Sequence, residues 1–445
     1  MIVSTYPKIL IFGAPFNNFY GGGITLSNLF KGWPKDKIAV AATGHVLQGV
    51  SFDVCDLYYR LGSDEQRWRF PLNLVQRSFP SGRVSPVKQI NPKPRRKRIR
   101  IRRILVNNIF YPVVHWFGLF HSLSAIHISD NFLDWLSDFK PELLYLQVSS
   151  REDILFATKL YDHLGIPAVI HMMDDWPSTI SKSGLFKNYW EKIIDSEFKQ
   201  LLDRMDLFLS ISDYMSAEYK NRYNKVFIPF HNPIDISRYK QIKVRETTDT
   251  KIFKMLYLGR LGLANKHAIF SFANAMSHIV DGNDKIELEI ITPGFDSTDA
   301  KKIDSYENVR VLPPVKHDMV PEVLTKYDFL LLPLDFTDHG FKFAQYSIPT
   351  KASEYMISGT PIIIFAPKET AISKFCSENE CAYCITENDE RKIIEALQYL
   401  LNNYEYRKKI SSNAVRLATE RFDSERVRNE FQQLLIKTTR QNVYE

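Results

Sequence analysis

Two series of alternating strand and helix signals limit what this chain can fold into. Short apolar runs are followed by longer stretches of helical periodicity, and this order repeats through both halves of the sequence. Because parallel strands need a helical crossover between them, the alternation predicts an α/β fold with doubly wound parallel sheets. We expect strands at 8–14, 37–43, 141–148, 167–172, 206–211, 225–229, 286–292, 309–312, 328–334, 362–365 and 381–385, with one more starting at 254.

The length of the chain indicates two domains. A chain of 445 residues exceeds what one hydrophobic core usually organises, and the polar stretch 241–251 separates the two series. We therefore predict an N-terminal domain over 1–240, a C-terminal domain over 251–423 and a last helical segment over 424–445. The content of 44% hydrophobic residues is typical of a soluble globular protein. Without a long apolar span or a leader-like N-terminus, we expect a cytoplasmic location.

The positive charge is concentrated in one excursion from the α/β pattern, at about 62–130. Residues 66–129 contain thirteen Lys and Arg residues and no Asp or Glu, and the rest of the chain holds 45 basic against 51 acidic residues. An apolar aromatic run, 104–120, follows the basic one. The composition of residues 93–120 therefore favours one of two structures. Either the segment contacts the inner face of an anionic membrane peripherally, or it forms a buried helix that follows a solvated basic loop. We do not expect nucleic-acid binding, because no reader motif accompanies the charge.

Three cysteines have a spacing that resembles a metal site. Cys376, Cys381 and Cys384 lie close in sequence, but the fourth cysteine, Cys55, is far away and 381–385 has the pattern of a core strand. We therefore predict no metal site.

Consecutive glycines follow the first expected strand. Gly21, Gly22 and Gly23 precede a helix expected over 24–32, so a ligand could approach backbone N–H groups at the helix N-terminus. A dinucleotide loop is disfavoured, because the G-x-G-x-x-G spacing is absent and the strand 37–43 does not end in an acid.

The segment 347–365 combines a helix start, a helix stop and a buried strand. Pro349 suits a first helical turn, and Gly359 and Pro361 end a helix expected over 351–358. Lys351 and Glu354 share one helical face near the N-terminus. That arrangement suits a nucleoside diphosphate, with phosphate at the cation and ribose hydroxyls at the acid.

Two further cations lie on a strand-to-helix loop, before a helix expected over 268–280. Arg260 and Lys266 could neutralise a leaving diphosphate, or could simply be solvated.

Together these segments resemble one known family. The pattern Ser347-x-Pro-x-Lys351-x-x-Glu354-Tyr-Met-x-x-Gly359-x-Pro resembles the donor-binding segment of bacterial group 1 glycosyltransferases of the family 4 type. The Gly-Arg260…Lys266 loop, the strand end at His171 and the segment 228–235 are also similar to that family.

The resemblance implies a GT-B fold, in which two Rossmann-like domains face a cleft and the helix of 424–445 crosses back to the first domain. It also implies an enzyme of polysaccharide or glycolipid assembly that transfers a sugar from a nucleotide-diphosphate sugar to a saccharide or lipid-linked acceptor. Transfer would retain the anomeric configuration, with neither metal nor cofactor. The implied donor-binding residues are Gly21, Gly22, Gly23, Arg260, Lys266, Ser347, Lys351 and Glu354, and the implied catalytic residues are His171, Asp174 and Asp175.

One departure from the family pattern keeps a second function open. Many members carry Glu-x7-Glu, but Tyr346 occupies the first of these positions. Lys351 or the sequence Asp338-His339-Gly340 could occupy the space that the first Glu of this pattern would fill. The alternative is a non-catalytic nucleotide-binding or interaction protein on the same fold.

Overall fold

The computed structural model divides the chain into two compact units, each described here by itself. It describes residues 6–17, 21–44, 46–47, 49–70, 72–74, 76, 78–84, 108, 110–180, 184–240, 252–278, 285–293, 297–303 and 305–441. The first unit comprises Met1–Ser210, Ser216–Pro229 and Glu430–Glu445, and the second comprises Ile211–Met215 and Phe230–Asn429.

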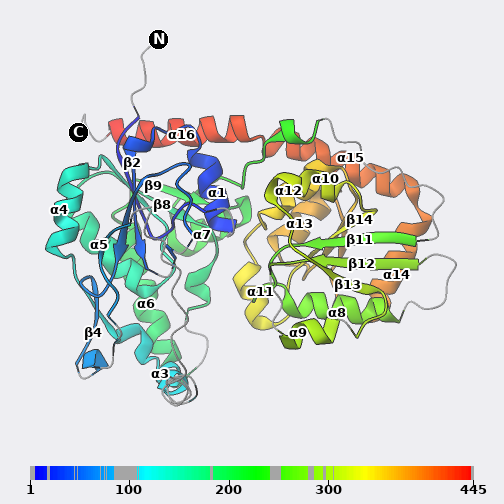
Figure 1. Ribbon diagram of the computed structural model, residues 1–445, viewed down its shortest axis with the longest axis horizontal. Helices are drawn as coiled ribbons and strands as arrows, with labels where there is room; N and C mark the ends of the chain where they lie inside the picture. Colours follow the sequence, from blue (N-terminus) through cyan, green and yellow to red (C-terminus); the bar gives the residue numbers. More distant parts are fainter. Residues whose placement is uncertain are drawn as a thin grey trace, which may run out of the picture. The chain divides into compact units, whose positions relative to one another are not determined.

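An eight-stranded sheet, counted over the described residues, organises the first unit (Figure 1). Its order is β10-β9-β8-β7-β1-β2-β3-β5, and the pairings are parallel except that of β3 with β5. The central strands form from apolar runs and are fully buried, as expected for strands covered on both faces. The strands are β1 (Ile9–Phe12), β2 (Ile38–Thr43), β3 (Leu57–Leu61), β5 (Gly82–Val84), β7 (Leu143–Leu146), β8 (Ala168–Met172), β9 (Leu207–Ser210) and β10 (Ile228–Pro229).

Helices cover this sheet, and a small antiparallel pair, β4 (Gln66–Trp68) with β6 (Ser124–Ile126), lies beside it. The helices of this half of the chain are α1 (Gly21–Phe30), α3 (Tyr111–Trp116), α4 (Asp130–Phe139), α5 (Arg151–Leu164), α6 (Lys187–Leu202) and α7 (Asp213–Tyr223). The last helix, α16 (Ser424–Gln441), belongs to the first unit from Glu430 onward. Its Phe431 packs edge-on against Phe30 of α1 and Tyr145 of β7, which fixes it on the core.

The second unit is built on a parallel sheet of six described strands in the order β13-β12-β11-β14-β15-β16. Figure 1 shows helices on both faces of it: α10, α12 and α13 on one, α8 and α9 on the other. The strands are β11 (Ile252–Leu258), β12 (Lys285–Ile291), β13 (Val309–Leu312), β14 (Phe329–Pro333), β15 (Ile362–Phe365) and β16 (Tyr383–Ile385). The helices are α8 (Lys266–Ser277), α9 (Ser297–Ile303), α10 (Val320–Leu324), α11 (Asp338–Ala344), α12 (Lys351–Ser358), α13 (Ala371–Glu378), α14 (Glu390–Asn402) and α15 (Tyr404–Arg421).

Alternating residues of β11 divide the core of the second unit into two layers. Leu256 packs in the layer formed with α12, α13 and α15, whereas Met255 and Tyr257 pack in the layer formed with α8 and α14. This alternation follows from the two-residue period of a strand. Tyr257 therefore has its ring on the α8 side of the sheet.

The structure differs from the sequence-based expectations in several places. The helix expected at 24–32 begins at Gly21, so the three glycines lie inside its first turn and not in a loop before it. The second unit begins at Phe230, earlier than the expected 251, because Ile234 and Tyr239 pack in its core and Ile234 pairs with Asp423. The excursion contains β4, β5, β6 and α3, and the stretch 85–107 lies outside the described residues.

Among the described residues, no helix combines the length and the apolar character needed to cross a bilayer.

The end of α12 gives a stability test. Gly359 has φ +75°, a left-handed conformation in which a side chain is strained. Gly359→Ala should lower the free energy of unfolding by about 1 kcal/mol. Gly22→Ala is the matched control, because Gly22 lies within α1 with nothing within 4 Å of an added Cβ, and it should leave stability unchanged or raised. Denaturant unfolding measures both variants, and equal stability of Gly359→Ala and the wild type would contradict the assignment of the cap.

Candidate active site

The candidate site lies at the carboxyl ends of the strands of the second sheet. The strand order reverses between β11 and β14, and ligands of open α/β sheets bind outside the strand ends at such a point. Arg260 follows β11 and Asp335 follows β14, so both lie at this switch point.

The side chain of Lys351 is held between the end of β11 and the ring of Tyr257. Its Nζ lies 4.9 Å from the centroid of that ring, a cation–π distance. Gly259 has φ +153°, and a Cβ added there would lie 1.3 Å from Nζ. The glycine therefore provides the space that the ammonium occupies. Burial lowers the pKa of Lys351 to about 8, although the charge of Glu354 opposes the shift.

Glu354 lies one helical turn after Lys351, near the N-terminus of α12. Burial raises the pKa of its carboxyl to about 7, while the charges of Lys351 and Arg238 act in the opposite direction. Arg238 ends a short 3-10 helix, Ile236–Arg238, and donates hydrogen bonds to the backbone carbonyls of His317, at 2.9 Å, and Asp318, at 3.3 Å. A half-buried acid therefore has two cations in its electrostatic surroundings.

Tyrosine hydroxyls and an asparagine fix the loop that carries Arg260. The hydroxyl of Tyr257 donates to the carbonyl of Arg260 at 2.6 Å and accepts from Nδ2 of Asn265 at 2.9 Å. On the other face of the sheet, the hydroxyl of Tyr355 accepts from the backbone N–H of Leu258 at 3.0 Å. These contacts tie β11, the following loop and α12 together. Arg260 itself is exposed.

Asp335 joins the end of β14 to the start of α8. One carboxylate oxygen accepts from the backbone N–H of Ala268 at 2.8 Å, and the backbone N–H of Asp335 donates to Ala264 at 2.7 Å. An acid at this place caps the helix and complements its dipole. Lys266, the first residue of α8, forms an ion pair with Asp299 at 2.7 Å.

Two side chains hold the loop that leads into α12. Ser212 donates to the carbonyl of Tyr346 at 2.5 Å, and Asn232 donates to the carbonyl of Thr350 at 3.1 Å. Ser347 lies in this loop, and its backbone N–H donates to Ala344 at 3.1 Å. The sequence Asp338-His339-Gly340 forms the first turn of α11, which is capped by Thr337.

In the first unit, His171 occupies a core position. It lies on β8, its Nδ1 is 2.5 Å from the hydroxyl of Tyr145, and its ring packs near Phe431. Burial lowers its pKa to about 3, so the imidazole is neutral. The strand order of this sheet reverses between β1 and β7, so β8, which carries His171, is not one of the two strands at the switch point. Its catalytic role stays a prediction.

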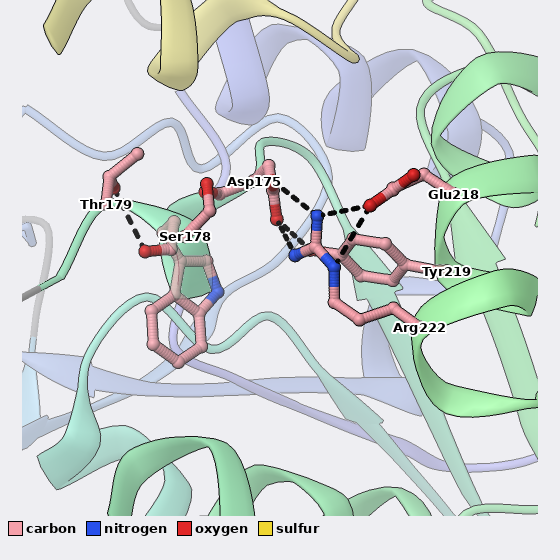
Figure 2. A network of polar contacts seen from close by, with 7 residues as sticks. Asp175, Ser178, Thr179, Glu218, Tyr219 and Arg222 are labelled. Carbon is pink, nitrogen blue, oxygen red and sulfur yellow. Dashed lines mark hydrogen bonds and ion pairs between the residues drawn. The ribbon is translucent and has the colours of Figure 1, made fainter. Parts of the chain in front are cut away.

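The two acids after β8 have different surroundings. Figure 2 shows Asp175 in a bidentate pair with Arg222 of α7, at 2.9 and 3.1 Å, with a further hydrogen bond at 2.9 Å from Tyr219. This buried carboxylate is fully engaged, and its arrangement favours a structural role. Asp174 is only half-buried, and burial together with the charge of Asp175 raises its pKa to about 6. Of the two acids, Asp174 is the one suited to proton transfer.

The three glycines contribute differently to α1. Gly23 packs against Asn17, because an added Cβ would lie 2.0 Å from its Nδ2, whereas Gly22 faces open space. The carbonyls of Gly21 and Gly23 accept hydrogen bonds from Thr25 and Ser27, within the helix.

The second unit thus brings its predicted donor-binding residues to one end of one sheet. Lys351 and the Arg260 loop are linked through Tyr257 and Asn265, and Tyr355 joins α12 to the end of β11. Glu354 lies on α12 one turn after Lys351, and Lys266 begins α8 directly after the loop. Sequence reasoning missed Arg238, Asp299 and Asp335, because their partners are far away in the sequence. It also missed Tyr257 and Asn265, although Tyr257 lies only two residues before the Gly-Arg pair.

Comparisons with known proteins gave one family match and several structural matches. Residues 252–403 match the family described as glycosyl transferases group 1. HepE from Anabaena, solved with UDP and glucose, has a TM-score of 0.57 at 13% identity, over 97% of this chain and 99% of that one. Sucrose-phosphate synthase from Thermosynechococcus elongatus has a TM-score of 0.61 at 13% identity, over 96% of this chain and 97% of that one. The trehalose-6-phosphate synthase OtsA has a TM-score of 0.59 at 10% identity, over 98% and 99%. No curated protein sequence matches the chain.

The structural matches define the architecture as the GT-B fold of glycosyltransferases, with two Rossmann-like domains. The sequence match covers residues 252–403, and it relates the second unit to the group 1 glycosyltransferases.

The contact between Gly259 and Lys351 gives a direct test of the site. Gly259→Ala should displace the Lys351 ammonium, because the added methyl group would occupy its position. We expect binding of a nucleotide sugar to weaken at least tenfold, measured by calorimetry. Gly262→Ala, in the same loop with open space around it, is the control and should bind as the wild type does. Equal affinity of the two variants would show that the position of Lys351 does not matter.

Proposed function

We propose that the protein transfers a sugar from a nucleotide-diphosphate sugar to an acceptor, with retained anomeric configuration and without a metal ion. The observation that carries this proposal is the half-buried Lys351 ammonium beside the Gly259-Arg260 turn, at the switch point of the second sheet.

Charge development during the reaction explains why fixed cations are needed. Departure of the diphosphate builds negative charge while the sugar becomes cationic at its anomeric carbon. Lys351, Arg260 and the N-terminal backbone N–H groups of α12 can stabilise that charge from fixed positions, which supports metal-independent transfer. Lys266 can also stabilise this charge when its ammonium leaves the ion pair with Asp299 and binds the phosphate instead.

Glu354 suits the nucleoside part of the donor. An ionised carboxylate in a site of low polarity accepts strong hydrogen bonds from ribose hydroxyls. The neighbouring charges of Arg238 and Lys351 favour its ionised form. HepE was solved with UDP and glucose, so a UDP sugar is the first donor to test.

The acceptor would be a saccharide or a lipid-linked sugar, as in polysaccharide or glycolipid assembly. Asp174 supports this part, because a half-buried acid with a pKa near 6 can accept the proton of an attacking hydroxyl. The charge of residues 93–120 supports peripheral attachment to an anionic membrane.

One observation favours a second candidate, a nucleotide-binding protein without turnover. Tyr346 replaces the acid of the family pattern, and its carbonyl is held by Ser212. Such a protein would bind UDP but would neither hydrolyse nor transfer a UDP sugar.

The proposal predicts the effect of removing donor contacts. Lys266→Ala and Glu354→Ala should each weaken UDP-glucose binding by about 10- to 100-fold, the loss of a hydrogen bond to a charged group. Lys326→Ala is the control, because this exposed lysine pairs with Glu322 on the surface of the same unit. Calorimetry measures binding, and release of labelled glucose measures turnover. Unchanged affinity in both site variants would contradict donor binding, and tight UDP binding without turnover across lipid-linked acceptors would favour the second candidate.

The two shifted pKa values predict a narrow pH optimum for donor binding. Glu354 loses its charge below about pH 7, and Lys351 loses its charge above about pH 8, so affinity for UDP-glucose should fall on both sides. The diphosphate of this ligand stays ionised throughout. Glu354→Gln should remove the acid limb and keep the alkaline one. A flat profile from pH 6 to 9, or an acid limb that persists in Glu354→Gln, would contradict the assignment.

A further inference from the structure

One end of the first unit exposes an apolar surface that the catalytic site does not use. It is formed by α3, by the adjoining 3-10 helix Leu119–Ser122 and by the start of α6 (Figure 1). We call this surface the aromatic tip, and its defining residues are Trp116, Leu185, Phe186 and Tyr189, which are exposed by 59%, 62%, 46% and 58%. The sequence analysis included Trp116 in its apolar aromatic run but did not single out Leu185, Phe186 or Tyr189.

Contacts beneath the aromatic tip fix the two segments as one surface. The backbone N–H of Leu185 donates to the carbonyl of Trp116 at 2.8 Å. Gly118 packs against the buried Trp190, because a Cβ added to this glycine would lie 2.4 Å from the indole ring. The ring of His121 lies 5.4 Å from that of Trp190. The segments are therefore anchored from below while their apolar side chains face outward.

The neighbouring strand pair extends the apolar character. Trp68 of β4 stacks on Phe110, just before α3, with ring centroids 6.2 Å apart. The backbone N–H of Arg69 donates to Leu123, and the following residues Phe70 and Leu74 are exposed by 79% and 76%. A monomeric soluble protein seldom leaves so many large apolar side chains together in water, so this end marks a contact surface.

The charge around the aromatic tip identifies its partner as anionic. The described stretches that form this end, 66–70, 110–126 and 184–190, contain Arg67, Arg69 and Lys187 and no Asp or Glu. Aromatic and aliphatic side chains together with cations are the composition of surfaces that lie at a lipid–water interface.

We infer that the aromatic tip inserts into the headgroup region of an anionic bilayer and anchors the first unit there. The inference rests on the membrane part of the proposed function and is independent of donor chemistry. Insertion of the four side chains supplies apolar burial, and the basic residues supply attraction to anionic lipid. The two contributions differ in salt dependence, because only the second is screened.

Vesicle binding by the full chain tests the inference. The tip variant replaces Trp116, Leu185, Phe186 and Tyr189 with Ser, and the control variant carries Val226→Ser and Ile252→Ser, which are exposed apolar residues elsewhere. On vesicles of phosphatidylcholine with phosphatidylserine, the tip variant should bind at least tenfold more weakly at both low and high salt. The control should bind as the wild type does. Hydrolysis of UDP-glucose without vesicles should be equal in all three proteins, so a failure here is separate from failure of the donor site.

Quenching by brominated acyl chains places the tip in the bilayer. Trp116 is the most exposed tryptophan among the described residues, so its emission should be quenched in the wild type and the quenching should be lost in Trp116→Phe, which still binds. Equal vesicle binding by the tip variant, or an equal loss in the control variant, would overturn the inference. Self-association of the wild type without vesicles that the tip variant abolishes would assign the surface to a second copy of the chain instead.

Discussion

The proposed donor site depends on one close contact, between the Lys351 ammonium and the backbone of Gly259. The contact is possible because Gly259 has no Cβ, and it keeps a half-buried cation over the ring of Tyr257. Burial makes the charge costly, which is why the pKa falls toward 8. In the proposed function, a bound diphosphate would offset this cost.

The rest of the second unit keeps this contact in place. A switch in strand order brings the ends of β11 and β14 together, and tyrosine hydroxyls connect β11 to its loop and to α12. Asp335 caps α8 and thereby fixes the start of the helix that carries Lys266. In the proposed function few of these groups contact the donor directly, but each fixes the position of a residue that would.

Local signals made much of this arrangement predictable from the sequence. Gly359 and Pro361 gave the limits of α12 and β15, and apolar runs gave most strands. Long-range partners were not predictable: no local pattern shows that Arg222 neutralises Asp175 or that Phe431 returns to β7. The predicted start of α1 was three residues too late, because glycine is a poor helix former and the sequence therefore indicated a loop. In the structure, packing of Gly23 against Asn17 overrides that preference. For His171, position on a strand end suggested chemistry, whereas its surroundings are those of a core residue.

The ionisation of Lys351 tests the account most directly. Heteronuclear NMR of the lysine side chain, assigned with Lys351→Arg, can follow its titration in the free protein and with UDP bound. The account predicts a pKa near 8 in the free protein and a clear rise with UDP, because the diphosphate stabilises the charged form. A pKa at the ordinary lysine value in the free protein, unchanged by UDP, would contradict it.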